Sequence, residues 1–532
     1  MGKRILKRLT HYGVWQFAIL GIFFTISAPI LAEFLHGLIS SDFLTPPKEF
    51  TLYLSYFIFA VILFLIVFLY EQHTIYKDKT HGRNYFSDRR KYGRSWLELI
   101  DYFKEADKYR VDPKTLPIED WRNADGIILG HIDKRLVKRD SDAKGNLALF
   151  ALPGGGKTTG QIIPTALRFA GSVFAIDIKG DILAITKKHR NIKIFSPDNK
   201  AGSCTFNPLY GMKEMQIKER KIAVEQMAAI LVPDEKESYF SDGGRDFFCG
   251  IALYLLNKNP DTTFPEIVKA IILGNGIDWV TIIKESDCQE AQEYTNSFYG
   301  TNERNVSGAY QNLSKKIRPM SNGDLDILLS GKGDCITPET LEQGYDVYIE
   351  IPQDKIKTYA PLTTIIVQTF MTSFLTRDDL STGKKNIPIL FLLDEFNELN
   401  FDYETLMTAL ATLRSKRVSL FMAQQSISQL KQKYGEEGFR GIIDTCGYVS
   451  LMSAQDPYNR QYFQELIGKR KTLKSAVSEN EKIVSRSSQE AEEYIFDSAD
   501  FNNFGDNVLI YCDGKYIVAK KCNINNQEVL SL

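Results

Sequence analysis

The feature that most constrains this 532-residue chain is an apolar segment that runs directly into a glycine-rich loop. Residues 147–164 read LALFALPGGGKTTGQIIP. The pattern predicts a buried strand, a loop over residues 151–159 and then a helix, which is a repeating unit of parallel α/β sheets. Pro164 falls inside the predicted helix, where proline normally causes a kink that costs about 3 kcal/mol.

The loop carries the residue types that bind a phosphate chain. Its glycines allow consecutive backbone N–H groups to converge on one anion, Lys157 reaches phosphate oxygens, and the Thr158 hydroxyl is a ligand for Mg²⁺. Ala151 stands where the pattern G-x-x-x-x-G-K-[ST] begins with glycine. We predict ATP and Mg²⁺ as cofactors, with a plain glycine-rich turn as the alternative. The predicted nucleotide-binding residues are Gly154, Gly155, Gly156, Lys157, Thr158 and Thr159.

A second segment supplies the acidic groups that such a loop needs. Ile389–Leu393 is a continuous apolar run, typical of a strand that is buried on both faces, and Asp394 and Glu395 follow it. Ligands bind at the carboxyl ends of strands in such sheets. We predict that Asp394 belongs to the magnesium shell and that Glu395 polarises the attacking water. An acidic turn after a strand is the alternative, and the presence of Lys157 and Thr158 in the same chain counts against it.

Two weaker candidates come from the next apolar strand, predicted over Val418–Met422. It ends in Gln424 and Gln425, and a glutamine there can hydrogen-bond the γ-phosphate or the nucleophilic water. Arg414 precedes the strand and is placed to act as an arginine finger across a subunit boundary. An ordinary loop glutamine and a solvated surface arginine are the alternatives.

The N-terminal region contains two long apolar segments. Val14–Leu31 and Phe50–Tyr70 contain no charged residue, and each is long enough to cross a hydrocarbon layer of roughly 30 Å. Basic residues cluster before the first segment and after the second, whereas Lys48 is the single basic side chain between them. We predict transmembrane helices near residues 14–35 and 50–70, with both termini cytoplasmic. A cleaved signal peptide and a buried core helix are the alternatives.

Composition excludes several classes of function. With 65 Lys and Arg against 66 Asp and Glu, the net charge of −1 does not favour a chain that coats nucleic acid, so any nucleic-acid contact is local. The seven cysteines form no CxxC pair, which argues against a zinc site or a disulfide framework. All six histidines lie at or before residue 189, so histidine-dependent hydrolase and metal chemistry is disfavoured in the rest of the chain.

Several further motifs occur in an order that resembles one family. They are GGGKTTGQIIPTAL, SVFAIDIKGDI, FNPLYG, SYFSDGGRDFF, LDEFNEL and QQSISQLKQKYG. This order is similar to that of type IV coupling proteins, the membrane-anchored ATPases of bacterial conjugation and type IV secretion. The resemblance spans essentially the whole chain. It implies a RecA-like P-loop ATPase that assembles as a hexamer, usually around DNA, and links a substrate complex to the secretion channel.

The resemblance also implies roles for individual residues. By position, Lys157 and Thr158 are the nucleotide lysine and hydroxyl, and Arg414 is similar in location to the family's proposed arginine finger. The implied catalytic residues are Lys157, Asp394, Glu395, Gln425 and Arg414, with Thr158 and Asp394 at the metal. Many members have proline-x-leucine-glycine after the acidic pair, where this chain has Asn397–Asn400.

The predicted fold is α/β: a RecA-like ATPase with a mostly parallel sheet, an inserted all-α domain and a two-helix membrane anchor. The predicted domains are a membrane module (1–95), a first nucleotide-binding part (96–210), an all-α insertion (211–335) and a second nucleotide-binding part (336–532). In the insertion, Phe247 and Phe248 are expected in the core of an amphipathic helix. Ser475–Ile495 is expected to be a mobile loop, and Asp513-Gly514 the turn of a hairpin.

The leading hypothesis is an inner-membrane ATPase that moves DNA with its attached relaxase, or protein effectors, into a type IV channel. Its expected partners are five more copies of the chain, DNA, a relaxase or effectors, channel subunits and the lipid bilayer. The alternative is a membrane docking platform whose nucleotide binding only sets its assembly state. A chromosome-segregation DNA pump is ranked lower, because it predicts four membrane spans and a winged-helix tail.

Overall fold

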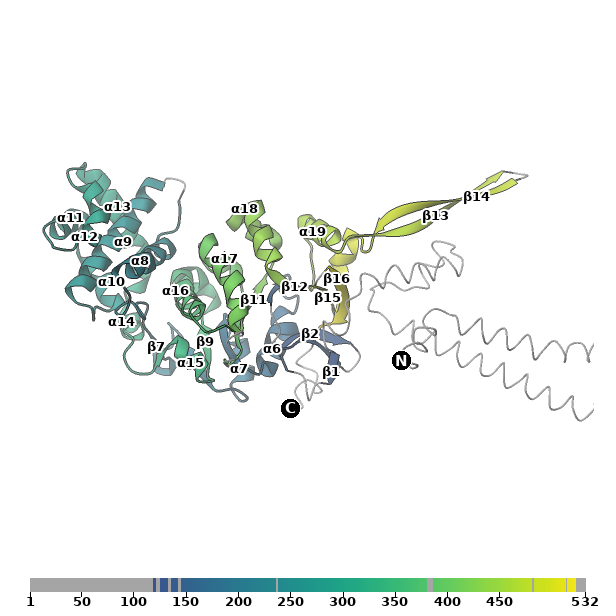
Figure 1. The fold of residues 1–532 in the computed structure, drawn as a ribbon, viewed down its shortest axis with the longest axis horizontal. Coiled ribbons are helices and arrows are strands. Elements are labelled where there is room, and N and C mark those ends of the chain that lie inside the picture. The colour runs from purple at the N-terminus through teal and green to yellow at the C-terminus, as the bar shows by residue number, and fades with distance from the viewer. Residues whose placement is uncertain are drawn as a thin grey trace, which may run out of the picture. The chain divides into compact units, whose positions relative to one another are not determined.

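The computed structural model describes most of the chain after residue 117 (Figure 1). The described ranges are 118–120, 125–132, 135–141, 145–235, 238–379, 386–480, 483–512 and 514–522. The predicted membrane helices near 14–35 and 50–70 lie outside these ranges. Among the described residues, no helix has both the length and the hydropathy that a membrane crossing requires. The described residues form two units, the smaller within 467–495 and 514–518 and the larger comprising the rest.

A twelve-stranded sheet has the strand order β1-β3-β2-β16-β15-β12-β4-β11-β10-β5-β9-β6. All neighbours from β12 to β6 pair in parallel, and the pairs toward β1 for which the register is known are antiparallel. The predicted α/β fold with a mostly parallel sheet is confirmed. The strands are β1 (Ile118–Asp120), β2 (Ile127–Ile132), β3 (Arg135–Arg139), β4 (Asn146–Phe150), β5 (Ser172–Asp177), β6 (Ile192–Phe195), β9 (Asp346–Glu350), β10 (Ile389–Leu393), β11 (Val418–Gln424), β12 (Cys446–Leu451), β15 (Asn507–Cys512) and β16 (Lys515–Lys520).

The central strands are apolar because helices cover the sheet that they form. Every residue of β4, β5, β10 and β11 is buried, as expected for parallel strands that have no solvent face. Phe174 of β5 lies 5.0 Å, between ring centroids, from both Phe370 of α16 and Phe391 of β10. The helices of this part are α6 (Ile163–Arg168), α7 (Asp181–Thr186), α15 (Pro338–Glu342), α16 (Ile356–Leu375), α17 (Tyr403–Thr412), α18 (Ile427–Asp444) and α19 (Pro457–Ile467).

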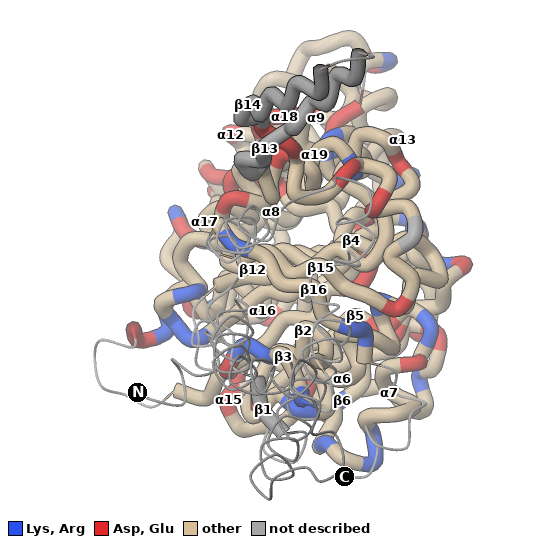
Figure 2. The backbone as a smooth tube through the Cα atoms, turned by 90° about the vertical axis from the view of Figure 1, so that its right-hand side faces the viewer, with Lys and Arg blue, Asp and Glu red and all other residues tan. Residues whose placement is uncertain are grey.

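A run of helices lies between the short paired strands β7 (Thr205–Phe206) and β8 (Cys335–Ile336). Phe247 and Phe248 of α9 are fully buried, and Phe247 stacks on Phe298, so the predicted core position of these two rings is confirmed. The helices are α8 (Ile217–Leu231), α9 (Ser238–Lys258), α10 (Phe264–Leu273), α11 (Gly276–Lys284), α12 (Gln289–Thr295), α13 (Glu303–Ile317) and α14 (Gly323–Leu328). Figure 2 shows basic and acidic positions interspersed along the described backbone.

The prediction of a mobile loop over Ser475–Ile495 is wrong. This segment belongs to a long two-stranded ribbon of β13 (Lys469–Asn480) and β14 (Ile483–Tyr494). The strands pair antiparallel from Lys469 opposite Tyr494 to Asn480 opposite Ile483. A serine- and charge-rich composition resembles that of a loop, but the register places basic positions of β13 opposite acidic positions of β14, and such cross-strand pairs are favourable.

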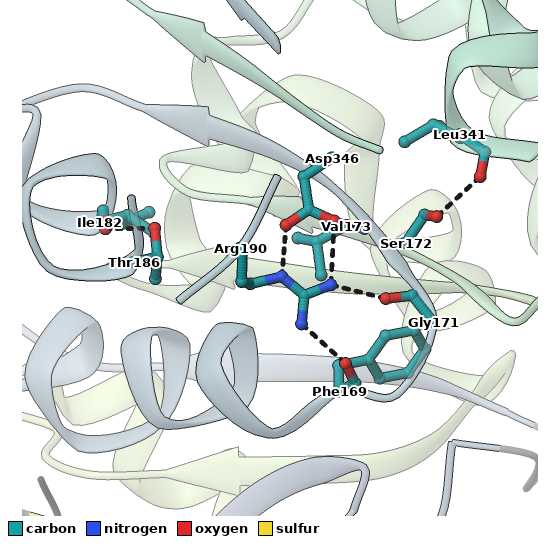
Figure 3. Close-up of polar contacts among 9 residues, drawn as sticks. All are labelled: Phe169, Gly171, Ser172, Val173, Ile182, Thr186, Arg190, Leu341 and Asp346. Atoms are coloured by element: carbon teal, nitrogen blue, oxygen red, sulfur yellow. Dashed lines mark hydrogen bonds and ion pairs between the residues drawn. The ribbon is translucent and has the colours of Figure 1, made fainter. Parts of the chain in front are cut away.

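A largely buried arginine ties several chain segments together at the amino-terminal end of β5 (Figure 3). The Arg190 guanidinium binds the Asp346 carboxylate through Nε and through Nη2, the latter at 2.9 Å. It also donates to the carbonyl oxygens of Phe169 at 2.8 Å and Gly171 at 2.6 Å. Asp346 in turn accepts from the backbone N–H of Val173 at 2.9 Å. One ion pair therefore fixes the start of β5 against β9 and the chain that follows α6.

Candidate functional site

The loop after β4 leads into an unusual first helical turn. Thr158–Ile162 form a π-helical turn, η2, and α6 begins at Ile163. Pro164 is consequently in the first turn of α6, where a backbone N–H has no intrahelical partner to lose. The predicted kink is thus replaced by a change of helix type just before the proline.

Each of the three loop glycines occupies a position that disfavours a side chain. Gly154 and Gly156 have φ values of 73° and 85°, in the left-handed region that glycine adopts readily. A Cβ atom on Gly155 would lie 2.8 Å from the carbonyl oxygen of Leu152. The two left-handed glycines turn the backbone sharply, as in loops whose N–H groups bind an anion. The Gly155 N–H donates to the Leu152 carbonyl oxygen at 2.8 Å within this turn.

Lys157 meets the acidic pair that the sequence placed almost 240 residues away. Its Nζ lies 2.9 Å from Asp394 Oδ1 and also forms an ion pair with Glu395. The contact follows from the topology: β11 lies between β4 and β10, and both outer strands run parallel to it. The end of β4 and the end of β10 are therefore on the same edge of the sheet.

The charges at this edge do not balance. Burial lowers the pKa of Lys157, but the nearby Asp394 and Glu395 carboxylates outweigh it and the net shift is upward. Burial raises the pKa of Asp394, and Lys157 only partly opposes this. One ammonium faces two carboxylates, so the group carries an excess negative charge when both are ionised. Oxygen ligands with excess negative charge fit a hard cation such as Mg²⁺.

The protein alone does not provide a complete metal cage in the region described. Within the described ranges, no three His, Cys, Asp or Glu side chains are arranged to hold a metal ion. Mg²⁺ usually keeps several waters and binds through one or two protein groups plus phosphate oxygens. Asp394, beside Lys157, offers carboxylate oxygens of the kind that such a shell uses. The Thr158 hydroxyl, in the turn that follows Lys157, stays the second predicted ligand.

Gln425 completes the carboxylate environment. It follows β11 directly, and its Nε2 lies 3.3 Å from Oε1 and 3.2 Å from Oε2 of Glu395. Glu395 itself has a left-handed backbone, with φ 52° and ψ 49°, a conformation that costs a non-glycine residue about 1 kcal/mol or more. Lys157, Asp394, Glu395 and Gln425 thus form one connected group.

Thr159, a predicted nucleotide-binding residue, lies in the π-helical turn and is exposed.

Arg414 is not part of this group within one chain. It lies in the 3₁₀ turn η9 (Leu413–Lys416), immediately before β11, and its side chain is exposed. Gln425 lies beyond the other end of β11, and seven strand residues span about 20 Å. Arg414 is therefore at the opposite edge of the sheet from Lys157.

Sequence reasoning missed two residues that contact the loop. Lys521, after β16, donates from Nζ to the carbonyl oxygens of Gly155 at 3.0 Å and Gly505 at 2.7 Å. Ser453, after β12, accepts from the backbone N–H of Leu152 through Oγ at 3.3 Å. Neither residue belongs to a recognisable motif, and each is more than 300 residues from the loop, so the sequence contained no signal for these contacts.

Comparison with known proteins agrees with this architecture. The family model described as Type IV secretory system Conjugative DNA transfer matches residues 105–494, which is most of the chain. The chain belongs to this family of type IV coupling proteins. Protein VirD4 of Rhizobium rhizogenes is 25% identical over 331 residues, covering 59% of this chain and 48% of VirD4. The probable conjugal transfer protein TraG of Sinorhizobium fredii is 25% identical over 422 residues, covering 70% and 62%.

The coupling-protein chain spans about half the length of the VirD4 relatives that it matches. Among solved structures, the bacterial conjugative coupling protein TrwBdeltaN70 in its unbound form has a TM-score of 0.60 at 18% identity, covering 79% of this chain and 90% of TrwB. TrwB in complex with ADP and Mg²⁺ has a TM-score of 0.57 at 16% identity, covering 80% and 93%. These two likenesses show a common fold.

Proposed function

We propose that this coupling protein is a membrane-anchored ATPase that recruits DNA with its attached relaxase, or protein substrates, and moves them to a type IV secretion channel. ATP hydrolysis supplies the energy. The observation that carries the proposal is the contact of Lys157 with Asp394 and Glu395. It supports the proposal because phosphoryl transfer needs a lysine for phosphate, a carboxylate for the metal and a group that orients the attacking water. TrwB has been solved with ADP and Mg²⁺, which supports the same cofactors here.

Each residue of the group has a role that its position supports. The loop over Gly154–Gly156 and the Lys157 ammonium would bind the phosphate oxygens. Asp394 and the Thr158 hydroxyl would hold Mg²⁺, which would supply charge neutralisation at those oxygens. Glu395 orients a water molecule for attack and accepts its proton. When Lys157 binds phosphate, it gives up its ion pair with Glu395. The Glu395 carboxylate is then free to orient the water molecule.

The Lys157→Ala variant of the full chain tests the proposal. We expect ATP turnover to fall by roughly 100-fold or more, because one charge and its phosphate contact are lost, and substrate transfer between cells to be lost with it. Lys213→Ala is the control, since Lys213 is an exposed lysine paired with Asp261 in the helical part. If the Lys157 variant lost turnover but still supported transfer, the protein would be a nucleotide-gated docking platform rather than a motor.

We further propose a hexamer in which Arg414 acts on the nucleotide of the adjacent subunit. Its exposure and its distance from Lys157 in the same chain support a role across a subunit boundary. Mixing inactive Lys157→Ala and Arg414→Ala chains tests this idea. Some mixed interfaces would combine an intact loop with an intact arginine, so partial recovery of turnover is expected. No recovery in stably mixed oligomers would contradict it.

The apolar segments Val14–Leu31 and Phe50–Tyr70 support an inner-membrane location with the ATPase part in the cytoplasm. A cysteine-accessibility assay checks this topology. A cysteine introduced at Ser41, between the segments, should react with a membrane-impermeant thiol reagent added to spheroplasts, whereas one introduced at Ser87 should react only after lysis. The opposite pattern would contradict the proposed orientation.

A further inference from the structure

The segment that carries Glu395 is a short turn with a strained start. Glu395 adopts a left-handed backbone conformation, and residues Phe396–Glu398 then form the 3₁₀ turn η8. Within this turn the backbone bonds are local, from Glu398 N–H to the Glu395 carbonyl at 2.9 Å and from Leu399 N–H to that of Phe396 at 3.2 Å. A turn held only by such bonds would leave the carboxylate free to swing. Its orientation therefore depends on contacts from outside the turn.

Besides the ion pair with Lys157, Gln425 and helix α18 supply these contacts. Gln425, Gln429 and Lys433 follow one another at intervals of four, which puts the two helical residues on the same face of α18. Gln425 binds the Glu395 carboxylate. Gln429 Oε1 accepts a hydrogen bond from Asn397 Nδ2. Gln425 and two positions of α18 thus reach the segment that follows β10.

Lys433 has the most specific placement of the three. Its Nζ donates to the carbonyl oxygen of Asn397 at 2.9 Å and to that of Leu399. Burial lowers the pKa of Lys433 to about 8, and the nearby charge of Glu398 only partly offsets this effect. An ammonium group aimed at two main-chain carbonyls fixes backbone, because charge-assisted hydrogen bonds are stronger than neutral ones.

The turn is also anchored on its other side. Asn400 donates its backbone N–H to Thr364 Oγ1 of α16 at 2.8 Å. Just beyond Lys433, Gly435 has φ 74° and ψ 178°, so the regular helix is interrupted there. The stretch of α18 that contacts the turn is therefore one short helical segment between Ser426, its N-cap residue, and this interruption.

We propose that Lys433 and Gln429 are positioning residues that hold Glu395 in the orientation required for ATP hydrolysis. This inference rests on the proposed role of Glu395 in activating water. Neither side chain touches the reacting atoms; both act through the backbone and side chain of the Asn397 turn.

Steady-state ATP turnover by the full chain tests the proposal, with Lys433→Met and Gln429→Leu as variants. We expect kcat to fall about 10- to 100-fold in Lys433→Met and less in Gln429→Leu, while KM for ATP changes less than about threefold, since small misplacements of a reacting group have effects of this size. Lys431→Met is the matched control. Lys431 is on the same helix but pairs with the partly exposed Glu436, so its kcat should stay within about twofold of wild type.

A second arm separates positioning from a general structural role. In a Glu395→Gln background, measured by single turnover, Lys433→Met should cause no further loss, because the group that it positions is already disabled. A further loss as large as in the wild-type background would overturn the proposal, and so would wild-type kcat in both single variants. If Lys433→Met did not fold, as judged by its melting curve, Gln429→Leu would carry the same comparison. A wild-type chain without ATP turnover would overturn the proposed function itself, whereas active wild type with unaffected variants would overturn the positioning alone.

Discussion

Replacing Asp346 by asparagine should destabilise the ATPase part although the residue is far from the nucleotide loop. Asp346 is 2% exposed and Arg190 is 14% exposed, so both charges are largely removed from water. The amide keeps the shape of the side chain but leaves the guanidinium without its counterion (Figure 3). Removal of one partner of a buried ion pair costs about 3–5 kcal/mol. Because Arg190 keeps its bonds to the carbonyls of Phe169 and Gly171, we expect a value near the lower limit, about 3 kcal/mol.

Urea unfolding of the full chain, followed by circular dichroism, measures this loss. Asp334→Asn is the control, since Asp334 pairs with Lys193 but is 63% exposed, and exposed pairs contribute about 0–1 kcal/mol. The double variant Arg190→Met/Asp346→Leu should be more stable than Asp346→Asn, because it leaves no unpaired charge. A loss below about 1 kcal/mol in Asp346→Asn, or a double variant no more stable than it, would refute the reasoning.

Two further predictions concern the loop and the turn beside it. Gly155→Ala should weaken ATP binding about tenfold, because its Cβ would lie 2.8 Å from the Leu152 carbonyl oxygen. Titration with a fluorescent ATP analogue measures this loss. Gly323→Ala is the control and should bind as wild type does, because its Cβ would meet nothing within 4 Å. Burial lowers the pKa of Lys433 to about 8 in the folded state, with Glu398 opposing it, so between pH 8 and about 10.5 the unfolded chain binds more protons and stability rises with pH. The free energy of unfolding of wild type, measured with urea relative to Lys433→Met, should therefore rise by about 1–2 kcal/mol from pH 7 to pH 9.5. If the difference between the two proteins were the same at both pH values, the assigned burial of Lys433 would be contradicted.

Strand positions near the site were predictable because the strands are buried on both faces. Ile389–Leu393 was predicted as a strand and is β10 with the same bounds. The strand predicted from Val418 also begins there, although it continues to Gln424 rather than ending at Met422. A central parallel strand must be apolar at every position, so its limits are visible in composition alone. The ribbon of β13 and β14 has no such signal, because its serine- and charge-rich sequence contains no continuous apolar run, and its strands are recognised only by their pairing.

At the site, the sequence indicated which residues are involved, whereas only the fold showed which of them are in contact. The glycines, Lys157 and the carboxylates could be named in advance, because phosphate and metal chemistry restricts the residue types at fixed spacing. That Lys157 contacts Asp394 and Glu395 required the strand order, since β11 separates the two strands that carry them. The π-helical turn that precedes Pro164, in place of the predicted kink, could likewise be seen only in the folded backbone.

Local chemistry in the sequence determined which residues can hold a triphosphate, which segments are buried strands and which family the chain resembles. Tertiary structure decided that Lys433 holds the turn beyond Glu395 and that Lys521 contacts the loop at Gly155. Both lysines donate to main-chain carbonyls, and every residue type offers a carbonyl. A contact of that kind imposes no pattern on its partner's sequence, so only the path of the folded chain can reveal it.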